Sequence, residues 1–343
     1  MKKLFHLLLI TVLLLVSLPV AAVSAEDAIL WQRSDDGMFT LYMYDVAIDP
    51  QTPSTLYVGT EEDGIFKSVN GGLSWNEVND GLPDTIVYTL AIDPQTPSTL
   101  YAGTWDGLFK STNGGESWSK INNGLAYGRV EAIAIDSQTP GTLYVGMYGK
   151  GVFKSVNSGG SWSEINTGLT NLGVTSIAVD PKTPGTLYAG TDFDGGVFKS
   201  VNGGQSWSAI NNGLTEPSVI FIAIDPQTPT TVYAGTWGGG VFRSVNGGDS
   251  WSEINNGLTD LNINSIAIDP HTPTTIYAGT HDDGIFKSVY GGESWRRADD
   301  GMTHHRVFSV VIDPRTPSTL YAGTFGDGVF KSDNYAESWR EVN

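Results

Sequence analysis

The stretch from Ser68 to Trp75, SVNGGLSW, decides the fold because it returns at a regular interval along the chain. Its later forms are STNGGESW, SVNSGGSW, SVNGGQSW, SVNGGDSW, SVYGGESW and SDNYAESW. The tryptophans that end these strings are spaced by 43, 44, 45, 44, 44 and 44 residues: Trp75, Trp118, Trp162, Trp207, Trp251, Trp295 and Trp339. A second string, IDP-x-TP-x-TLY-x-GT, recurs at the same interval from Ile48, Ile92, Ile135, Val179, Ile224, Ile268 and Ile312. Repeats of this length indicate a β-propeller, whose blades each contain four strands.

Each repeat is expected to contain four short strands, which we name A to D in chain order. Residues 265–268 exemplify strand A, 186–191 strand B, 196–200 strand C and 250–255 strand D. Asp-Pro-x-Thr-Pro separates A from B, and Asn-Gly-Gly separates C from D; both are turn-forming sequences. We therefore predict an all-β fold, a seven-bladed β-propeller of four-stranded antiparallel blades. At about 44 residues per repeat, it fills residues 26–343 as one domain.

The composition excludes several classes of protein. The chain has no cysteine, so it has neither a disulfide framework nor a cysteine-based zinc site. Lys and Arg number 19 against 37 Asp and Glu, a net charge of −18 that would repel a nucleic-acid backbone. With 40% hydrophobic residues, the chain can bury a core and is not a disordered polymer.

Residues 1–25 read as a signal peptide. Lys2 and Lys3 precede an apolar run from Leu7 to Val16, and Val23-Ser24-Ala25 provides small residues for cleavage. This run is shorter than the roughly 20 residues that span a membrane, so we expect cleavage rather than an uncleaved anchor. The mature chain is then secreted or periplasmic, without a membrane span, and we expect it to be a monomer.

The two ends of the chain resemble each other. Trp31 to Met38, WQRSDDGM, is identical to Trp295 to Met302, WRRADDGM, at six of eight positions. The chain thus contains eight D-like segments for seven blades. Either residues 31–35 or residues 339–343 could close the ring, and the sequence leaves both possibilities open.

The pattern Ser-x-Asn-x-Gly-x-x-Trp resembles the Asp-box, or BNR repeat, with Asn where that family usually has Asp. The resemblance implies a structural hairpin between the third and fourth strands of each blade, away from the active face. Asp-box propellers include sialidases, xyloglucan-cleaving glycosidases, the sortilin receptor domain and photosystem II assembly factors, and this chain is similar to unspecialised bacterial members. Tyr290 and Ala336 depart from the pattern and should mark weaker turns.

The loops of the two faces of the predicted propeller differ. The A–B and C–D loops, on one face, scarcely vary between repeats, and their aspartates are expected to cap turns: Asp49, Asp93, Asp136, Asp180, Asp225, Asp269 and Asp313. The B–C and D–A loops, on the other face, vary most, which favours that face for binding. The candidate ligand-binding residues follow strand B: Trp105, Asp106, Tyr148, Phe193, Trp237, His281, Asp283 and Phe325.

Aromatic rings beside carboxylates suit sugars, because ring C–H groups stack while the acids accept hydrogen bonds from hydroxyl groups. The alternative is that the same aromatic side chains pack between neighbouring blades. The two interpretations differ in whether these rings are exposed.

The sequence contains few of the residue combinations that catalytic or metal sites require. A sialidase needs three convergent arginines, yet only Arg129 and Arg306 lie on the variable loops. His304 and His305 lack a third ligand at metal spacing, so we expect no metal and no cofactor. A glycoside hydrolase needs two carboxylates in defined separation, which Asp63 and Asp106 could supply from neighbouring blades.

The sequence therefore predicts a secreted, non-catalytic binding module, with a glycan or a protein as its partner on the variable loops. Two alternatives remain: a xyloglucanase-like glycoside hydrolase using loop carboxylates, and an assembly or scaffold factor for an envelope complex.

Overall fold

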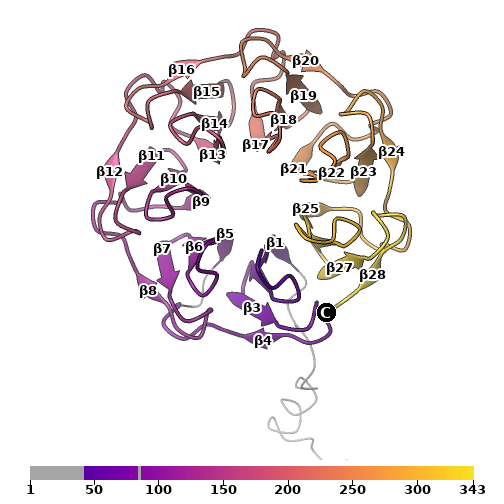
Figure 1. Cartoon of the computed structure of the whole chain (residues 1–343), viewed down its shortest axis with the longest axis horizontal. Coiled ribbons are helices and arrows are strands. Elements are labelled where there is room, and N and C mark those ends of the chain that lie inside the picture. Colours follow the sequence, from indigo (N-terminus) through magenta and orange to yellow (C-terminus); the bar gives the residue numbers. More distant parts are fainter. Residues whose placement is uncertain (1–41, 84–85) are drawn as a thin grey trace, which may run out of the picture. The chain divides into compact units, whose positions relative to one another are not determined.

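The computed structural model describes residues 42–83 and 86–343, which form seven four-stranded antiparallel sheets arranged in a ring (Figure 1). Each sheet contains four consecutive strands of the chain, so the predicted seven-bladed propeller is confirmed. The signal peptide and the D-like segment at residues 31–35 lie outside the described residues. Within the described part, no helix is long and apolar enough to cross a membrane.

Strands A line the centre of the ring. They are β1 (Met43–Ile48), β5 (Val87–Ile92), β9 (Val130–Ile135), β13 (Val174–Val179), β17 (Val219–Ile224), β21 (Ile263–Ile268) and β25 (Val307–Ile312). Strands B come next and are buried throughout: β2 (Leu56–Thr60), β6 (Leu100–Thr104), β10 (Leu143–Met147), β14 (Leu187–Thr191), β18 (Val232–Thr236), β22 (Ile276–Thr280) and β26 (Leu320–Thr324).

Strands C follow: β3 (Ile65–Ser68), β7 (Gly107–Ser111), β11 (Gly151–Ser155), β15 (Gly196–Ser200), β19 (Val241–Ser244), β23 (Ile285–Ser288) and β27 (Val329–Ser332). Strands D form the rim: β4 (Asn76–Glu77), β8 (Ser119–Lys120), β12 (Ser163–Glu164), β16 (Ser208–Ala209), β20 (Ser252–Glu253), β24 (Arg296–Arg297) and β28 (Arg340–Glu341). Strand D was predicted to run from Ser-Trp to Ile-Asn, which is wrong. The ladder with strand C contains only two residues of strand D, because the backbone N–H of the tryptophan before them donates to the preceding blade instead, as Trp251 does to the Asn212 carbonyl. The residue after them still donates one backbone hydrogen bond to strand C, as Ile254 does to the Val241 carbonyl.

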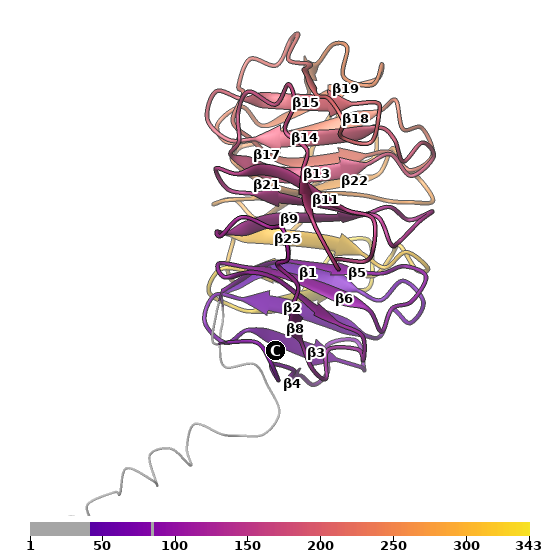
Figure 2. The ribbon, with the colours of Figure 1, turned by 90° about the vertical axis from the view of Figure 1, so that its left-hand side faces the viewer.

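The strands run across the thickness of the ring, between two faces (Figure 2). Antiparallel order places the A–B and C–D loops on one face, which we call the uniform face. It places the B–C and D–A loops on the opposite face, which we call the variable face. The variable face carries all the residues that the sequence singled out as candidates for binding.

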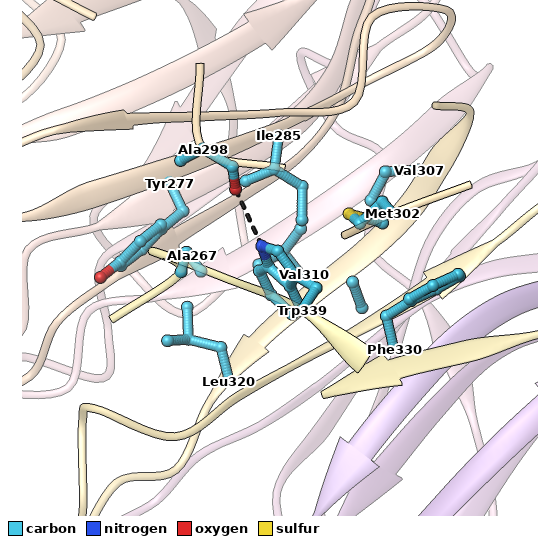
Figure 3. Close-up of a cluster of buried hydrophobic side chains, with 12 residues drawn as sticks. Ala267, Tyr277, Ile285, Ala298, Met302, Val307, Val310, Leu320, Phe330 and Trp339 are labelled. Atoms are coloured by element: carbon cyan, nitrogen blue, oxygen red, sulfur yellow. Dashed lines mark hydrogen bonds between the residues drawn. The ribbon is translucent and has the colours of Figure 1, made fainter. Parts of the chain in front are cut away.

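The core consists of clusters shared between neighbouring blades. One cluster combines Tyr277 and Ile285 of the sixth blade with Val310, Phe330 and Trp339 of the seventh (Figure 3). Trp339 is only 5% exposed, and its indole N–H donates to the Ala298 carbonyl on the preceding blade over 2.8 Å. The tryptophan at the end of each hairpin thus acts as a lock between two neighbouring blades.

Hydrogen bonds within each C–D hairpin repeat as the sequence predicts. In the first blade, Gly72 N–H donates to Ser68 Oγ and Ser74 N–H donates to Asn70 Oδ1. Tyr290 replaces this asparagine, so its hairpin keeps the serine bonds without the side-chain amide. In the last hairpin, Tyr335 and Ala336 adopt φ values of 60° and 63°, a region that glycine occupies with less strain. Both departures remove a favourable feature from the turn.

The aspartates of the uniform face cap the A–B loops as predicted. Asp225 Oδ1, for example, accepts hydrogen bonds from the N–H groups of Gln227 and Thr228, and the other six aspartates do the same. The residue after the loop proline then reaches the next blade. Gln227 Nε2 donates to the carbonyls of Pro270 and His271, and equivalent side chains make such bonds at most of the other blade junctions.

The C-terminal segment supplies the outermost strand of the last blade, where β28 pairs with β27. Side chains then join the last blade to the first. Trp75 Nε1 donates to the Val342 carbonyl over 2.6 Å, and Arg315 Nε donates to the Pro50 carbonyl over 3.1 Å. An isolated antiparallel bridge between Tyr42 and Phe325 adds a backbone contact between the same two blades. Among the described residues, each four-stranded sheet still consists of strands from one repeat.

Candidate functional site

A β-bulge near the start of each strand A builds the wall of the central channel. In β1, Met43 pairs with Thr60 and Asp45 with Gly59, which leaves Tyr44 between them without a partner in the ladder. The first residue of the strand is then buried while the bulged residue faces the channel. The seven bulged residues range from aromatic to acidic, polar and aliphatic: Tyr44, Tyr88, Glu131, Thr175, Ile220, Asn264 and Phe308.

The channel has a volume of about 780 Å³ and is lined by strands A of all seven blades. Its wall changes along its length. Aromatic rings lie at the variable face, a layer that includes Asp45 and Ser309 follows, and aliphatic residues such as Ile48 and Ile268 line the end toward the uniform face. The chemically individual side chains therefore gather at one end of the channel, which we call the mouth.

An arc of aromatic rings surrounds part of the mouth. The ring centroids of Tyr44 and Tyr88 lie 5.4 Å apart, as do those of Tyr44 and Phe308. Phe308 continues to Phe325 at 5.7 Å and to His281 at 6.3 Å. Such separations are those of stacked and edge-to-face pairs, which hold large side chains in place without hydrogen bonds. The arc therefore presents a fixed apolar surface at the channel mouth.

One end of the arc holds a cation. The guanidinium of Arg129 lies 4.8 Å from the ring centroids of both Tyr88 and Tyr148, so two aromatic faces sandwich it. Arg129 also pairs with Glu131. Burial nevertheless raises the pKa of Glu131, although the arginine acts in the opposite direction. Asp192 lies on the next blade, and its charge raises the pKa of Tyr148.

The other end of the arc is formed by Trp237 and His281, whose rings meet edge to face at 4.7 Å. An isolated bridge to Asn262 anchors the backbone of Trp237, and its side chain is 45% exposed. Burial, followed by the nearby Arg306 charge, lowers the pKa of His281. Both effects favour the neutral form of His281, although Asp282 and Asp260 act in the opposite direction.

Asp45 lies in the channel beneath the aromatic rings and joins three blades. Its carboxylate accepts hydrogen bonds from Val46 N–H on its own strand, Leu90 N–H on the second blade and Ser309 Oγ on the seventh. Burial raises the pKa of Asp45 to about 6 despite these donors. Asp45 was not among the candidates selected from the sequence, although it is an acid at a position that serine, threonine or apolar residues occupy in the other repeats.

The structure separates the eight candidate residues into two groups. Tyr148, Trp237, His281 and Phe325 belong to the aromatic arc. Trp105, Asp106, Phe193 and Asp283 lie elsewhere on the variable face. Trp105 and Phe193 are 54% and 68% exposed, and neither pairs with another aromatic ring among the described residues.

The two carboxylates of the second group turn toward the outer strands. Asp106 pairs with Lys120 on β8 at 2.6 Å. Asp283 accepts a hydrogen bond from Thr259 and lies 3.9 Å from Arg297 on β24. These acids are therefore positioned away from the channel. The described residues also contain no cluster of three or more side chains suited to holding a metal ion.

The structure divides these rings between the two interpretations. Trp237 and Phe325 contact His281 and Tyr42 of the neighbouring blades, at centroid distances of 4.7 and 4.3 Å. Trp105, Tyr148, Phe193 and Trp237 are nevertheless all more than 40% exposed, and Phe325 is half-buried. The buried interblade aromatic residues are instead those of strands B and C and of the C–D hairpins, such as Tyr188, Phe198 and Trp207. The variable face thus keeps its rings available to solvent.

The sequence reasoning missed Tyr44, Tyr88, Glu131 and Phe308. A strand with strict alternation would give one face to every second residue, and the bulge breaks this alternation. A signal was present all the same. In the repeats, the first residue of strand A is always apolar, whereas the second varies from Tyr and Phe to Glu, Thr, Ile and Asn.

No protein-family model matches the sequence, and no curated protein matches it. Solved structures do share the fold. The GH74 enzyme of Niastella koreensis matches with a TM-score of 0.72 at 20% identity, covering 88% of this chain and 54% of the enzyme. The GH74 xyloglucanase of Xanthomonas campestris matches with a TM-score of 0.74 at 17% identity, covering 89% and 55%.

A third match is the protein YCF48 bound to D1 peptide, with a TM-score of 0.67 at 14% identity, covering 87% of this chain and 94% of YCF48. The chain thus spans about half the length of the two GH74 enzymes and nearly the whole of YCF48. At these identities the similarity establishes the fold alone.

Proposed function

We propose that this chain is an exported Asp-box propeller that acts as a non-catalytic binding module. Its ligand contacts the channel mouth on the variable face. The observation that carries the proposal is the solvent-accessible aromatic arc, from Trp237 through His281 and Phe308 to Tyr44 and Tyr88. Exposed aromatic surface with a few polar groups beside a cavity is typical of ligand sites.

The arc suits two kinds of ligand. A sugar ring would stack its C–H groups on Trp237 while carboxylates such as Glu131 accept hydrogen bonds from its hydroxyl groups. A protein segment would place a side chain in the channel and its backbone across the exposed rings. The likeness to YCF48, which is solved with a bound peptide, favours the second ligand as a candidate.

The predicted signal peptide at residues 1–25 supports an extracytoplasmic location, secreted or periplasmic. The ligand would then be an extracellular or envelope component.

A glycoside hydrolase is the competing proposal because two GH74 enzymes share the fold. Hydrolysis requires one protonated acid and one free carboxylate on opposite sides of the scissile bond. Near the mouth, Glu131 pairs with Arg129, and Asp45 is held by three donors. Farther out, Asp106 pairs with Lys120. Each of these acids already has an ionic or hydrogen-bond partner within the protein, which supports binding without catalysis.

Glycan-array binding and reducing-sugar release from xyloglucan test the proposal together. We expect a Trp237-dependent ligand without release of sugar. Trp105→Ala is the matched control, because Trp105 is an equally exposed tryptophan of the same loop in another repeat but lies outside the arc. Release of sugar that one Asp→Asn change on the variable face abolishes would establish the hydrolase instead. Loss of binding in Trp105→Ala with full binding in Trp237→Ala would contradict the site.

A further inference from the structure

We propose that the ligand of the channel mouth is a basic polypeptide segment, one of whose Lys or Arg side chains enters between the aromatic rings. This inference rests on the proposed function and selects a protein rather than a glycan as the partner. Two observations support this inference: the distribution of charge between the two faces, and the aromatic rings and carboxylates that lie together at the mouth.

Most of the described cations lie outside the loops of the variable face, although Lys120 and Arg297 reach Asp106, Asp283 and Asp299 in those loops from the outermost strands. Six of the seven strands C carry a Lys or Arg that donates across the blade junction to a carbonyl of the next C–D hairpin: Lys67, Lys110, Lys154, Lys199, Arg243 and Lys287. Lys331 on the seventh strand C pairs with Asp333 in its own hairpin. Four more, Lys120, Arg296, Arg297 and Arg340, lie on the outermost strands, and Lys182 and Arg315 lie in A–B loops. The variable-face loops within the described residues retain Arg129, Lys150 and Arg306 as their Lys and Arg residues.

Acidic residues dominate the variable face. The B–C loops contain Glu61, Glu62, Asp63, Asp106, Asp192, Asp194, Asp282, Asp283 and Asp327. The described D–A loops add Asp80, Glu216, Asp260, Asp299 and Asp300. A surface that surrounds a cavity with one sign of charge concentrates the field there and attracts ligands of the opposite sign. The complementary partner is therefore cationic.

The mouth itself combines aromatic faces with carboxylates. Glu61 accepts a hydrogen bond from the Tyr44 hydroxyl, and Asp192 lies beside Tyr148. Arg129 already shows what this arrangement accepts, because its guanidinium lies between two tyrosine faces and contacts Glu131. Tyr44 and Phe308 offer further rings farther along the arc. A partner cation would gain the same cation–π and ionic contacts.

The acids of the mouth carry charges that their surroundings do not fully compensate. Burial raises the pKa of both Glu131 and Asp192 even though the Arg129 charge lowers each of them. An incoming cation would stabilise both carboxylates, whereas an incoming anion would destabilise them further. A neutral sugar could donate hydrogen bonds to these carboxylates but would bring no charge to balance theirs. The charge balance therefore favours a basic segment over a glycan.

The test compares synthetic peptides of repeating Gly-Lys-Ser, Gly-Gln-Ser and Gly-Glu-Ser units by calorimetric titration of the full mature chain. We expect the lysine peptide to bind at least about tenfold more tightly than the glutamine peptide, and more weakly as salt rises. The double variant Glu61→Gln, Asp192→Asn should weaken that binding by about three- to tenfold. Trp237→Ala should weaken it as well.

The matched control is Glu116→Gln, Asp249→Asn, which removes two exposed acids from C–D hairpins of the uniform face. It changes the net charge equally and should alter binding by less than about twofold. Equal losses in the two double variants would overturn the inference, because binding would then follow total charge rather than the mouth.

The inference and the proposed function fail in different ways. If a neutral oligosaccharide binds in a Trp237-dependent manner and the lysine peptide does not, the proposed function stands and the basic ligand is wrong. If neither ligand responds to Trp237→Ala, both the site and its ligand are wrong.

Discussion

The uniform and variable faces are built from the same repeat, yet they use their residues differently. On the uniform face, side chains repeat because each makes the same bond to the next blade: Gln227 to the following A–B loop, Lys199 to the following hairpin. On the variable face, equivalent positions hold Trp237, His281 and Phe325, which contact rings rather than backbone. Repetition thus marks the residues that hold the ring together, and variation marks those free to meet a ligand.

The comparison also explains where the cations lie. Cations of strand C donate across the blade junctions to hairpins of the uniform face, whereas the described loops of the variable face contain few cations and many acids. The comparison predicts large stability effects for repeated residues and small ones for variable residues.

The largest expected effect is that of a hairpin tryptophan. Trp207 is 4% exposed and its indole N–H donates to the Ile165 carbonyl on the preceding blade at 2.7 Å. Trp207→Ala should lower the free energy of unfolding by about 3–5 kcal/mol, because a cavity forms and Ile165 loses its donor. Equilibrium urea unfolding measures the change. Val201→Ala, an exposed position of the same hairpin, should change stability by about 0.5 kcal/mol or less. Similar losses in the two variants would contradict the interblade lock.

Asp45 should give a smaller effect that depends on pH. Its pKa is raised from 3.8 to about 6 in the folded chain, so the folded state binds the proton more tightly than the unfolded state. The contribution of Asp45 to stability is then present at low pH and is lost as pH rises from about 4 to 6. Relative to Asp45→Asn, the wild type should lose on the order of 2 kcal/mol across that window.

Urea unfolding of both proteins at several pH values measures this difference. Asn cannot accept from Leu90 N–H with its amide nitrogen, so the variant is destabilised at every pH, and the pH dependence of the difference is the informative quantity. A difference that stays constant from pH 4 to 7 would show that Asp45 keeps an ordinary pKa.

The side-chain hydrogen bonds between neighbouring A–B loops, which we call the A–B belt, should contribute less to the free energy of unfolding at each blade junction. Gln227→Ala removes two exposed hydrogen bonds to the next blade and should lower the free energy of unfolding by roughly 0.5–1 kcal/mol. His271 is the control, because within the described residues its side chain makes no such bond to the next loop. His271→Ala should leave stability unchanged in the same urea experiment. If the two variants behave alike, the belt does not stabilise the ring.

Much of the fold could be predicted from the sequence because its determinants are local. The Asn70 turn and the Asp225 cap act within a few residues of their position, and the repeats carry the same signal along the chain. The length of strand D was wrong because the backbone N–H of the hairpin tryptophan donates to a carbonyl of the preceding blade, as Trp251 does to Asn212, which is a tertiary contact.

The candidate site could be predicted only in part. Tyr148, Trp237, His281 and Phe325 follow strand B and are visible in any alignment of the repeats. Tyr44 and Phe308 reach the mouth through a bulge that the hydrophobic pattern does not reveal. The partners of Asp106 and Asp283 on outer strands depend on side-chain directions, which the sequence does not specify.

The difference between the two faces is tested most directly by urea unfolding of Trp237→Ala. Trp237 is 45% exposed and belongs to the variable face, so its removal should change the free energy of unfolding by about 0.5 kcal/mol or less. A loss of several kcal/mol, comparable to that of Trp207→Ala, would mean that the variable rings hold the blades together and would contradict a face reserved for recognition.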